Sequence, residues 1–180
     1  MQQPVILPWK NVRPTVAADA FVAPNATLIG DVVIGARSSI WFNVVLRGDV
    51  NYIRVGERTN IQDGTIVHVA TNDGPTLIGN DVLIGHAAII HGCTLEDGCF
   101  VGMAATVMDD AVVESGAMVA AGALIPPGKR VKSHQLWAGT PARFVRQLTD
   151  AEVAQMKVQT ARYADLADAY RAMIAAEKRL

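Results

Sequence analysis

Aliphatic residues recur at every sixth position through most of the chain. From Val16 the sequence divides into six-residue segments that each open with an aliphatic residue, and the segments resume after an interruption at Tyr52–Arg54. A period of six fits neither an amphipathic helix nor a simple array of hairpins. It is typical of short strands joined by sharp corners, with the first residue of each segment pointing inward.

The fifth position of the segment carries a second regularity, because it is repeatedly small or β-branched. The residues found there are Ser38, Thr59, Thr65, Cys99, Ala105, Ala111, Ala117 and Ala123. A small side chain at this place would fill the bend between two strands. Three strands would complete a triangular coil of about 18 residues, and neighbouring coils would stack about 4.8 Å apart through ladder hydrogen bonds. The pattern therefore predicts a parallel β-solenoid.

The repeats are expected to occupy residues 1–145, and residues 146–180 are expected to form a C-terminal helix packed along the solenoid. Thr149 and Glu152 have the spacing of a capping box at the start of this helix. An apolar stripe at near-helical spacing follows. Its members are Val153, Met156, Val158, Tyr163, Leu166, Tyr170 and Ile174.

Three of the four histidines, His68, His86 and His91, fall in a short stretch around a loop that lengthens the repeat, TNDGPT. After this loop the repeat can restart at Leu77 or at Ile78. We prefer Ile78, which requires one shortened corner before Leu95. The fifth positions in this frame are Val82, Ala88 and Thr94.

In this frame His68 and His91 each follow an inward aliphatic residue on the same face of neighbouring coils, so they point outward about one strand spacing apart. His86 lies on another face near a corner and is not expected to reach that pair within its own chain. Two stacked histidines alone are also compatible with a simple polar ladder, and the remaining histidine, His134, is expected to be an ordinary surface residue.

Zinc binds imidazole nitrogens at about 2.0–2.1 Å in a near-tetrahedral array. The His68–His91 pair of one subunit and His86 of a neighbour can satisfy this geometry. A closed ring with three such contacts is a homotrimer. The three histidines therefore indicate metal ligands divided across a subunit interface.

Composition excludes several classes of function. The chain has 180 residues, a net charge of −1 and a pI of about 6.4, so no broad basic face invites nucleic acid or anionic lipid. No apolar run is long enough for a membrane span, and the start of the sequence does not show the pattern of a signal peptide. Cys93 and Cys99 show no CxxC spacing and are expected to be reduced core residues of a cytoplasmic protein.

Two runs narrow the prediction further: LRGDVNYIRVGERTNIQDGTIVH (46–68) and IGHAAIIHGCTLEDGCFVGMAATVMD (84–109). They resemble γ-class carbonic anhydrases within the hexapeptide-repeat proteins, and the hexad resemblance covers roughly residues 11–145. The resemblance implies a mainly β fold, a left-handed parallel β-helix with a C-terminal α-helix. It also implies a homotrimer with zinc, or alternatively Fe²⁺ or Co²⁺, between subunits, and no organic cofactor.

The family's metal ligands fall on His68, His86 and His91, and its other site residues fall on Arg47, Asp49, Asn60, Gln62, Asp63 and Tyr163. Gln62 is then expected to hydrogen-bond the hydroxide or the bicarbonate product. Arg47 is expected to pair with Asp49 or Asp63, in its own chain or the next. The plainer interpretations are a surface ion pair for Asp49 and a corner residue for Asn60.

The activity that the resemblance implies is the reversible hydration of CO₂ to bicarbonate. Zinc lowers the pKa of a bound water to about 7, which provides a hydroxide at neutral pH that attacks CO₂. Relatives carry a glutamate directly after the equivalent of Asp49 and another in a long acidic loop, whereas this chain has Val50 and a short loop whose acidic residue is Asp73. Hydration is therefore expected to be slow. The alternatives are a hexapeptide-repeat thioesterase or CoA-dependent acyltransferase, or a structural subunit whose metal staples the trimer.

Overall fold

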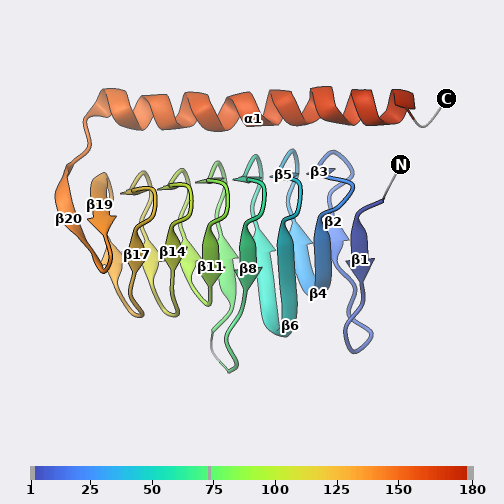
Figure 1. Cartoon of the computed structure of the whole chain (residues 1–180), viewed down its shortest axis with the longest axis horizontal. Coiled ribbons are helices and arrows are strands. Elements are labelled where there is room, and N and C mark those ends of the chain that lie inside the picture. Colours follow the sequence, from blue (N-terminus) through green and yellow to red (C-terminus); the bar gives the residue numbers. More distant parts are fainter. Residues whose placement is uncertain (1–2, 73, 178–180) are drawn as a thin grey trace.

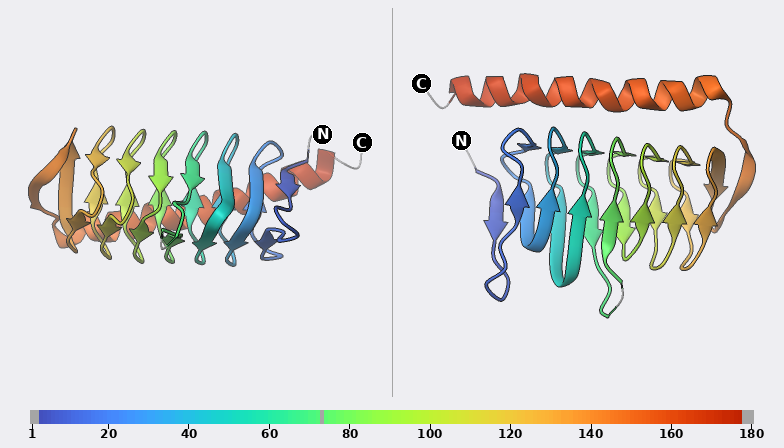
Figure 2. Two further views of the ribbon diagram at one scale, coloured as in Figure 1. Left: turned by 90° about the horizontal axis from the view of Figure 1, so that it is seen from below. Right: turned by 180° about the vertical axis from the view of Figure 1, so that it is seen from behind.

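The computed structural model describes residues 3–72 and 74–177 as a three-sided parallel β-solenoid with one long helix along one face (Figure 1). The helix runs back along the solenoid, so its C-terminal end lies beside the N-terminal coils (Figure 2). This is the mainly β, left-handed parallel β-helix with a C-terminal helix that the sequence predicts.

Each face is a ladder of parallel strands from successive coils. Two long strands, β4 (Thr27–Ile34) and β6 (Val45–Val55), turn a corner and belong to faces one and two together. Face one adds β1 (Val5–Leu7), β8 (Ile66–His68), β11 (Ile89–His91), β14 (Thr106–Val107) and β17 (Leu124–Ile125). Face two adds β2 (Thr15–Val16), β9 (Thr76–Ile78), β12 (Thr94–Leu95), β15 (Val112–Val113) and β18 (Arg130–Val131).

Face three is a separate ladder that lies beneath the helix. Its strands are β3 (Phe21–Val22), β5 (Ser39–Ile40), β7 (Asn60–Ile61), β10 (Leu83–Ile84), β13 (Phe100–Val101), β16 (Met118–Val119), β19 (Gln135–Gly139) and β20 (Ala142–Gln147). The last pair, β19 and β20, is antiparallel. This hairpin ends the solenoid, and the six-residue repeat did not predict it.

The core consists of the first and fifth residues of the hexads. First-position side chains such as Leu28, Ile61 and Ile84 are fully buried, and so is each of the small fifth-position residues named above from Ser38 to Ala123. Inward aliphatic side chains gain burial on all three faces, while the small residue lets the backbone bend around them. The prediction of an inward first residue and a small fifth one is confirmed.

The corner itself depends on the fourth residue of the hexad, which the hydrophobic repeat did not indicate. This residue adopts the left-handed conformation in coil after coil, with φ between 53° and 71°. The residues concerned are Arg37, Asn43, Arg58, Gly64, Asp81, Ala87, Gly98, Ala104, Asp110, Gly116, Gly122, Gly128 and His134. Glycine, asparagine and aspartate tolerate this conformation best, which explains their frequency at this place.

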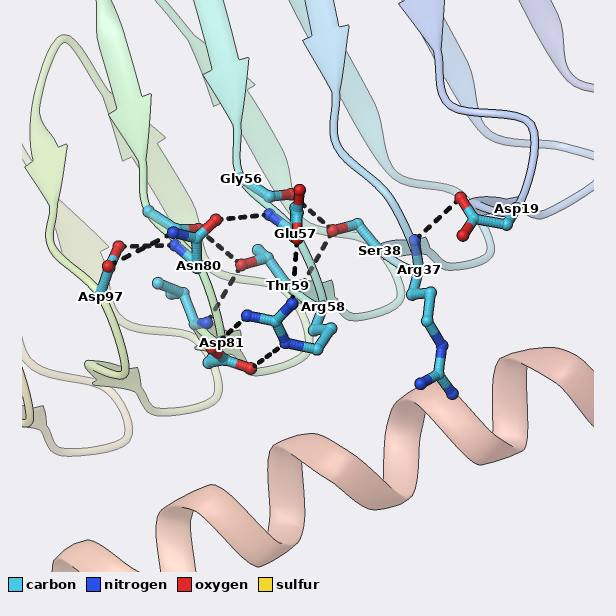
Figure 3. Close-up of polar contacts among 12 residues, drawn as sticks. Asp19, Arg37, Ser38, Gly56, Glu57, Arg58, Thr59, Asn80, Asp81 and Asp97 are labelled. Atoms are coloured by element: carbon cyan, nitrogen blue, oxygen red, sulfur yellow. Dashed lines mark hydrogen bonds and ion pairs between the residues drawn. The ribbon is translucent and has the colours of Figure 1, made fainter.

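Polar side chains at one row of corners join successive coils (Figure 3). The Ser38 hydroxyl donates to the Gly56 carbonyl at 2.7 Å, and the Thr59 hydroxyl donates to the Gly79 carbonyl at the same distance. Arg58 makes two parallel hydrogen bonds of 2.8 Å to the Asp81 carboxylate of the next coil. The buried hydroxyls thereby satisfy carbonyls that the corner geometry turns away from the ladders.

The repeat frame around the histidines follows the prediction with one correction. Ile78, Ile84, Ile90 and Leu95 all point inward, and the shortened corner lies at Gly92, which has a φ of 53°. Because one residue is missing there, Cys93 fills the bend and Thr94 begins strand β12, so the assignment of Thr94 to the small position was wrong.

Both cysteines are free and buried, as predicted. Burial raises the pKa of the Cys93 thiol to about 12, so this thiol remains protonated at neutral pH. The cysteines therefore act as small core residues of the solenoid.

Helix α1 (Asp150–Glu177) begins with the predicted capping box, in which the Thr149 N–H donates to the Glu152 carboxylate and the Glu152 N–H donates to the Thr149 hydroxyl. The division at residue 145 falls within β20 and remains a prediction. Among the described residues, α1 included, no helix combines the length and the apolar character that crossing a bilayer requires.

The apolar stripe of α1 differs from the prediction at two places. The residues that face the solenoid alternate at spacings of four and three: Met156, Thr160, Tyr163, Ala167, Tyr170 and Ile174. Tyr163 and Tyr170 pack edge-on against Trp41 of face three. Val158 and Leu166 lie off this line and are 49% and 43% exposed, so their assignment to the stripe was wrong.

This arrangement makes a prediction for two side chains of α1. Met156→Ala should lower the free energy of unfolding by about 2–4 kcal/mol, because it leaves a cavity beneath the helix. Leu166→Ala should change it by less than about 1 kcal/mol, because this side chain remains largely in solvent. Denaturant unfolding at one fixed protein concentration measures both, and equal losses would contradict the stripe.

Candidate metal centre

His68 and His91 lie next to each other on face one. Strands β8 and β11 pair in register, with His91 opposite His68, and both side chains point outward because Val67 and Ile90 point into the core. His68 Nδ1 lies 3.1 Å from His91 Nε2. The repeat frame predicted this stacking.

A carboxylate holds the far nitrogen of each imidazole. His68 Nε2 lies 3.0 Å from an oxygen of Asp49, and His91 Nδ1 forms a short hydrogen bond to Asp109. A carboxylate only accepts hydrogen bonds, so each neutral imidazole donates its N–H to its carboxylate. The two nitrogens that face each other then both carry lone pairs.

Two facing lone pairs repel each other unless a cation lies between them. Two ligands of a tetrahedral zinc ion with bonds of 2.0–2.1 Å lie about 3.3 Å apart, close to the separation of these two nitrogens. Carboxylates that orient histidines from behind are also typical of metal sites. The donor set and its geometry therefore fit a metal ion.

Arg47 completes this side of the site. It forms a short ion pair with Asp49 of its own chain, one of the alternatives left open by the sequence. Partial burial raises the pKa of the Asp49 carboxyl, but hydrogen bonds from His68 and Arg47 outweigh it, so the pKa lies below its usual value. Asp49 is therefore ionised at neutral pH and accepts the His68 N–H.

His86 lies elsewhere, in the turn that follows β10. Its Nδ1 lies 2.9 Å from an oxygen of Asp63, which leaves Nε2 without a proton in the neutral ring. His86 lines a groove between face three and α1, together with Gln62 and, from α1, Tyr163. Burial, and then the charge of Asp63, raise the pKa of the Tyr163 phenol, so this side chain remains protonated at neutral pH.

Asn60 lies in strand β7 and not at a corner, so the corner interpretation was wrong. It is buried beneath α1, one residue before Ile61, and neither atom of its side-chain amide has a hydrogen-bond partner among the described residues. A buried amide without partners is costly and calls for an explanation. Asn60 is therefore a candidate for a role in the site beyond packing.

The predicted residues other than Asn60, together with Asp109, form two half-sites on different sides of one chain. The first half-site contains Arg47, Asp49, His68, His91 and Asp109, and the second contains Gln62, Asp63, His86 and Tyr163. Within the described part of the chain, no group of three histidine, cysteine, aspartate or glutamate side chains lies close enough to hold a metal. One chain therefore carries both half-sites, but they lie apart from each other.

Asp109 was not among the predicted site residues. The shortened corner at Gly92 makes this coil 17 residues long, with Ile90 opposite Val107, so Asp109 lies one residue beyond the position opposite His91 and its carboxylate reaches the His91 ring. A search for carboxylates one coil away from each histidine would have found it. Val50, beside Asp49, is 51% exposed, whereas Asp73 lies outside the described residues.

Comparisons with known proteins show which proteins this chain resembles. Residues 13–48 match the model of the bacterial transferase hexapeptide family (six repeats). "Gamma carbonic anhydrase 1, mitochondrial" of Arabidopsis thaliana is 52% identical over 88% of this chain, and the chain spans about 60% of that protein's length. "Carbonic anhydrase" of Geobacillus kaustophilus is 40% identical, with 94% of this chain and 92% of that protein aligned.

Solved structures show the same fold. The hexapeptide transferase family protein from Anaplasma phagocytophilum has a TM-score of 0.89 and 51% identity, with 92% of this chain and 98% of that chain covered. A putative acetyltransferase of Bacillus cereus has a TM-score of 0.93 and 34% identity, with 96% and 99% covered. Together with the near full-length match to the Geobacillus protein, these findings show that the chain belongs to the γ-class carbonic anhydrase-like family of hexapeptide-repeat proteins.

Proposed function

We propose that this protein is a metal-dependent lyase that hydrates CO₂ reversibly to bicarbonate at a centre shared between two subunits of a homotrimer. The observation that carries the proposal is the pair of carboxylate-held imidazoles whose free nitrogens lie 3.1 Å apart. The names of the Arabidopsis and Geobacillus relatives support the reaction class. We place the protein in the cytoplasm.

The trimer is proposed because one chain separates its half-sites. Outward side chains beside the histidines on face one are apolar: Ile66 is 48% exposed and Ile89 is 43% exposed, and they pair with each other in register. Apolar side chains exposed in a row are typical of a surface that another subunit covers. Packing this face against the His86 corner of a neighbour would bring three imidazoles together and bury the isoleucines.

The ligands would be His68 and His91 of one subunit and His86 of the next, with Zn²⁺ as the proposed metal and Fe²⁺ or Co²⁺ as alternatives. Three imidazoles leave a fourth position open, which is typical of catalytic sites. A bound metal of this kind supplies a hydroxide nucleophile at neutral pH.

The chain's own residues would position the ligands and the substrate. Asp49, Asp63 and Asp109 hold the imidazole N–H groups and so would fix which nitrogen is free to bind a metal. Arg47 keeps Asp49 ionised. The Gln62 amide, on the His86 side, would donate a hydrogen bond to an oxygen of the substrate or the bicarbonate, and Tyr163 would limit access from the helix side.

A second candidate function is supported by one comparison. The Bacillus cereus structure is described as a putative acetyltransferase, which fits a CoA-dependent acyltransferase or a thioesterase on the same scaffold. Assays of acetyl transfer from acetyl-CoA and of thioester hydrolysis separate this candidate from CO₂ hydration. Metal bound at full stoichiometry without any of these activities would favour the third candidate, a structural subunit.

The ligand assignment predicts the outcome of four substitutions. His68→Ala, His86→Ala and His91→Ala should each remove the metal, because the remaining two imidazoles bind it far more weakly. His134→Ala is the matched control, since His134 is exposed at a distant corner. Metal content after dialysis against a chelator measures all four. Full stoichiometry in any of the first three would exclude that residue as a ligand.

The absence of a glutamate after Asp49 predicts that proton transfer limits hydration. The rate should rise with the concentration of a small buffer such as imidazole, which replaces the missing side chain by diffusion. Val50→Glu should raise turnover at low buffer by about tenfold or more, since a placed acid or base contributes roughly 10²–10⁴-fold. The exposed Val50 leaves room for the longer side chain.

Stopped-flow hydration at matched metal content tests this prediction. Val145→Glu is the control, because Val145 is equally exposed but lies on β20, away from the site. A rate that is independent of buffer, or no gain from Val50→Glu, would show that proton transfer is not the limiting step.

A further inference from the structure

A groove runs between α1 and face three and opens at the second half-site. It has a volume of about 570 Å³, and its walls include Phe100 and Met118 of face three together with Gln159 and Arg162 of α1. Gln62, His86 and Tyr163 lie at one end of it. A site for CO₂, which has three heavy atoms, does not require this volume, which is typical of pockets for much larger ligands.

The groove results from a change in side-chain size along one ladder. The second residue of each hexad points outward on face three, and Trp41 and Gln62 are large residues there that lie buried at 4% exposure. In the next coils the same place is occupied by Gly85, Gly102 and Ala120. The helix therefore rests on bulky side chains in one half and spans a hollow in the other.

The floor of this hollow is fixed by the stacking of the coils. An added Cβ at Gly85 would lie 2.6 Å from the Met103 nitrogen, and one at Gly102 would lie 2.4 Å from the Ala121 nitrogen. Both are backbone atoms, so a larger residue requires the coils to move apart. The groove is therefore a preformed feature of the solenoid.

The groove also carries polar side chains, among them Gln62 of face three and Arg162 of α1. Gln62 is only 4% exposed, and its side-chain amide forms no hydrogen bond with the described residues. Arg162 forms no ion pair within the described part of the chain. An amide donor and a free cation beside an apolar channel are complementary to an anion with an apolar tail.

We propose that this groove binds a monocarboxylate with a medium-length unbranched chain. Bicarbonate and a carboxylate share the planar CO₂⁻ group, so the end of the groove that would receive bicarbonate would also receive the carboxylate. The alkyl chain replaces the bicarbonate hydroxyl and lies along Phe100, Met118 and Ala120. The placement of the polar end rests on the proposed function, whereas the apolar channel stands on the geometry of the groove.

Isothermal titration of the metal-loaded protein with acetate, butyrate, hexanoate and octanoate tests this inference without any substitution. Each buried CH₂ contributes about a fourfold gain in affinity, so octanoate should bind at least tenfold more tightly than butyrate. Equal affinity along the series would overturn the proposal.

Substitutions then separate the tail from the head. Ala120→Leu should fill the groove and weaken octanoate at least tenfold while leaving acetate unchanged. Arg162→Gln should weaken the whole series by one common factor of about threefold or more, as expected for a contact to the charged head. Ala161→Leu is the matched control, because Ala161 lies on the other flank of α1, beside Lys157. The site would be contradicted if Ala161→Leu lost octanoate binding or if Ala120→Leu kept it unchanged.

Failure of this proposal is distinguishable from failure of the proposed function. If the protein hydrates CO₂ but octanoate neither binds to it nor inhibits it, the function stands and the groove is excluded as a carboxylate site. Octanoate binding that depends on Ala120, in a protein without hydration activity, would support the groove and contradict the lyase proposal.

Discussion

The in-register pairing of β8 with β11 is the interaction on which the site depends. In a strand the side chains alternate between the two sides, so a shift of one residue would send His68 or His91 into the core. Val67 and Ile90, both fully buried, prevent that shift because their burial would be lost. The hydrophobic repeat that folds the solenoid therefore also sets two imidazoles side by side on its surface.

The same rigidity explains why the site is divided. Outward side chains on different faces of a three-sided prism diverge, and the backbone ladders leave no freedom to bring them together. His86 is fixed at its turn by the coil beneath it and by Asp63. A second chain is the simplest means to complete the coordination, and the exposed isoleucines of face one would supply the apolar contact area that such an association requires. Under the proposed function, the placement of the half-sites on different faces of the solenoid makes activity depend on assembly.

The sequence predicted the features that depend on periodicity. The inward aliphatic residues, the small fifth residues, the stacked His68–His91 pair and the capping box at Thr149 all follow from local spacing, and the structure confirms them. It did not predict the partners of the histidines or the end of the solenoid. The Asp109–His91 pair joins two coils, and the β19–β20 hairpin replaces the repeat with long-range pairing.

The errors have specific physical causes. Thr94 was misplaced because a shortened corner removes one residue without changing the hydrophobic pattern, so that Cys93 fills the bend. Val158 and Leu166 were assigned to the buried side of α1 on hydrophobicity, although Thr160 and Ala167 are the small residues that let the helix approach face three. Under the proposed function the half-sites meet through a second chain, and spacing within one chain does not give the geometry of that contact.

Mixed trimers test the shared metal centre most directly. His86→Ala homotrimers keep the imidazole pair but lack its partner, and homotrimers with both His68→Ala and His91→Ala lack the pair. When the two variants are unfolded together and refolded, a trimer that contains both should regain one complete site, with one tightly bound metal and hydration activity absent from either parent. Mixed trimers, isolated by two different affinity tags, without bound metal would contradict a centre shared between subunits.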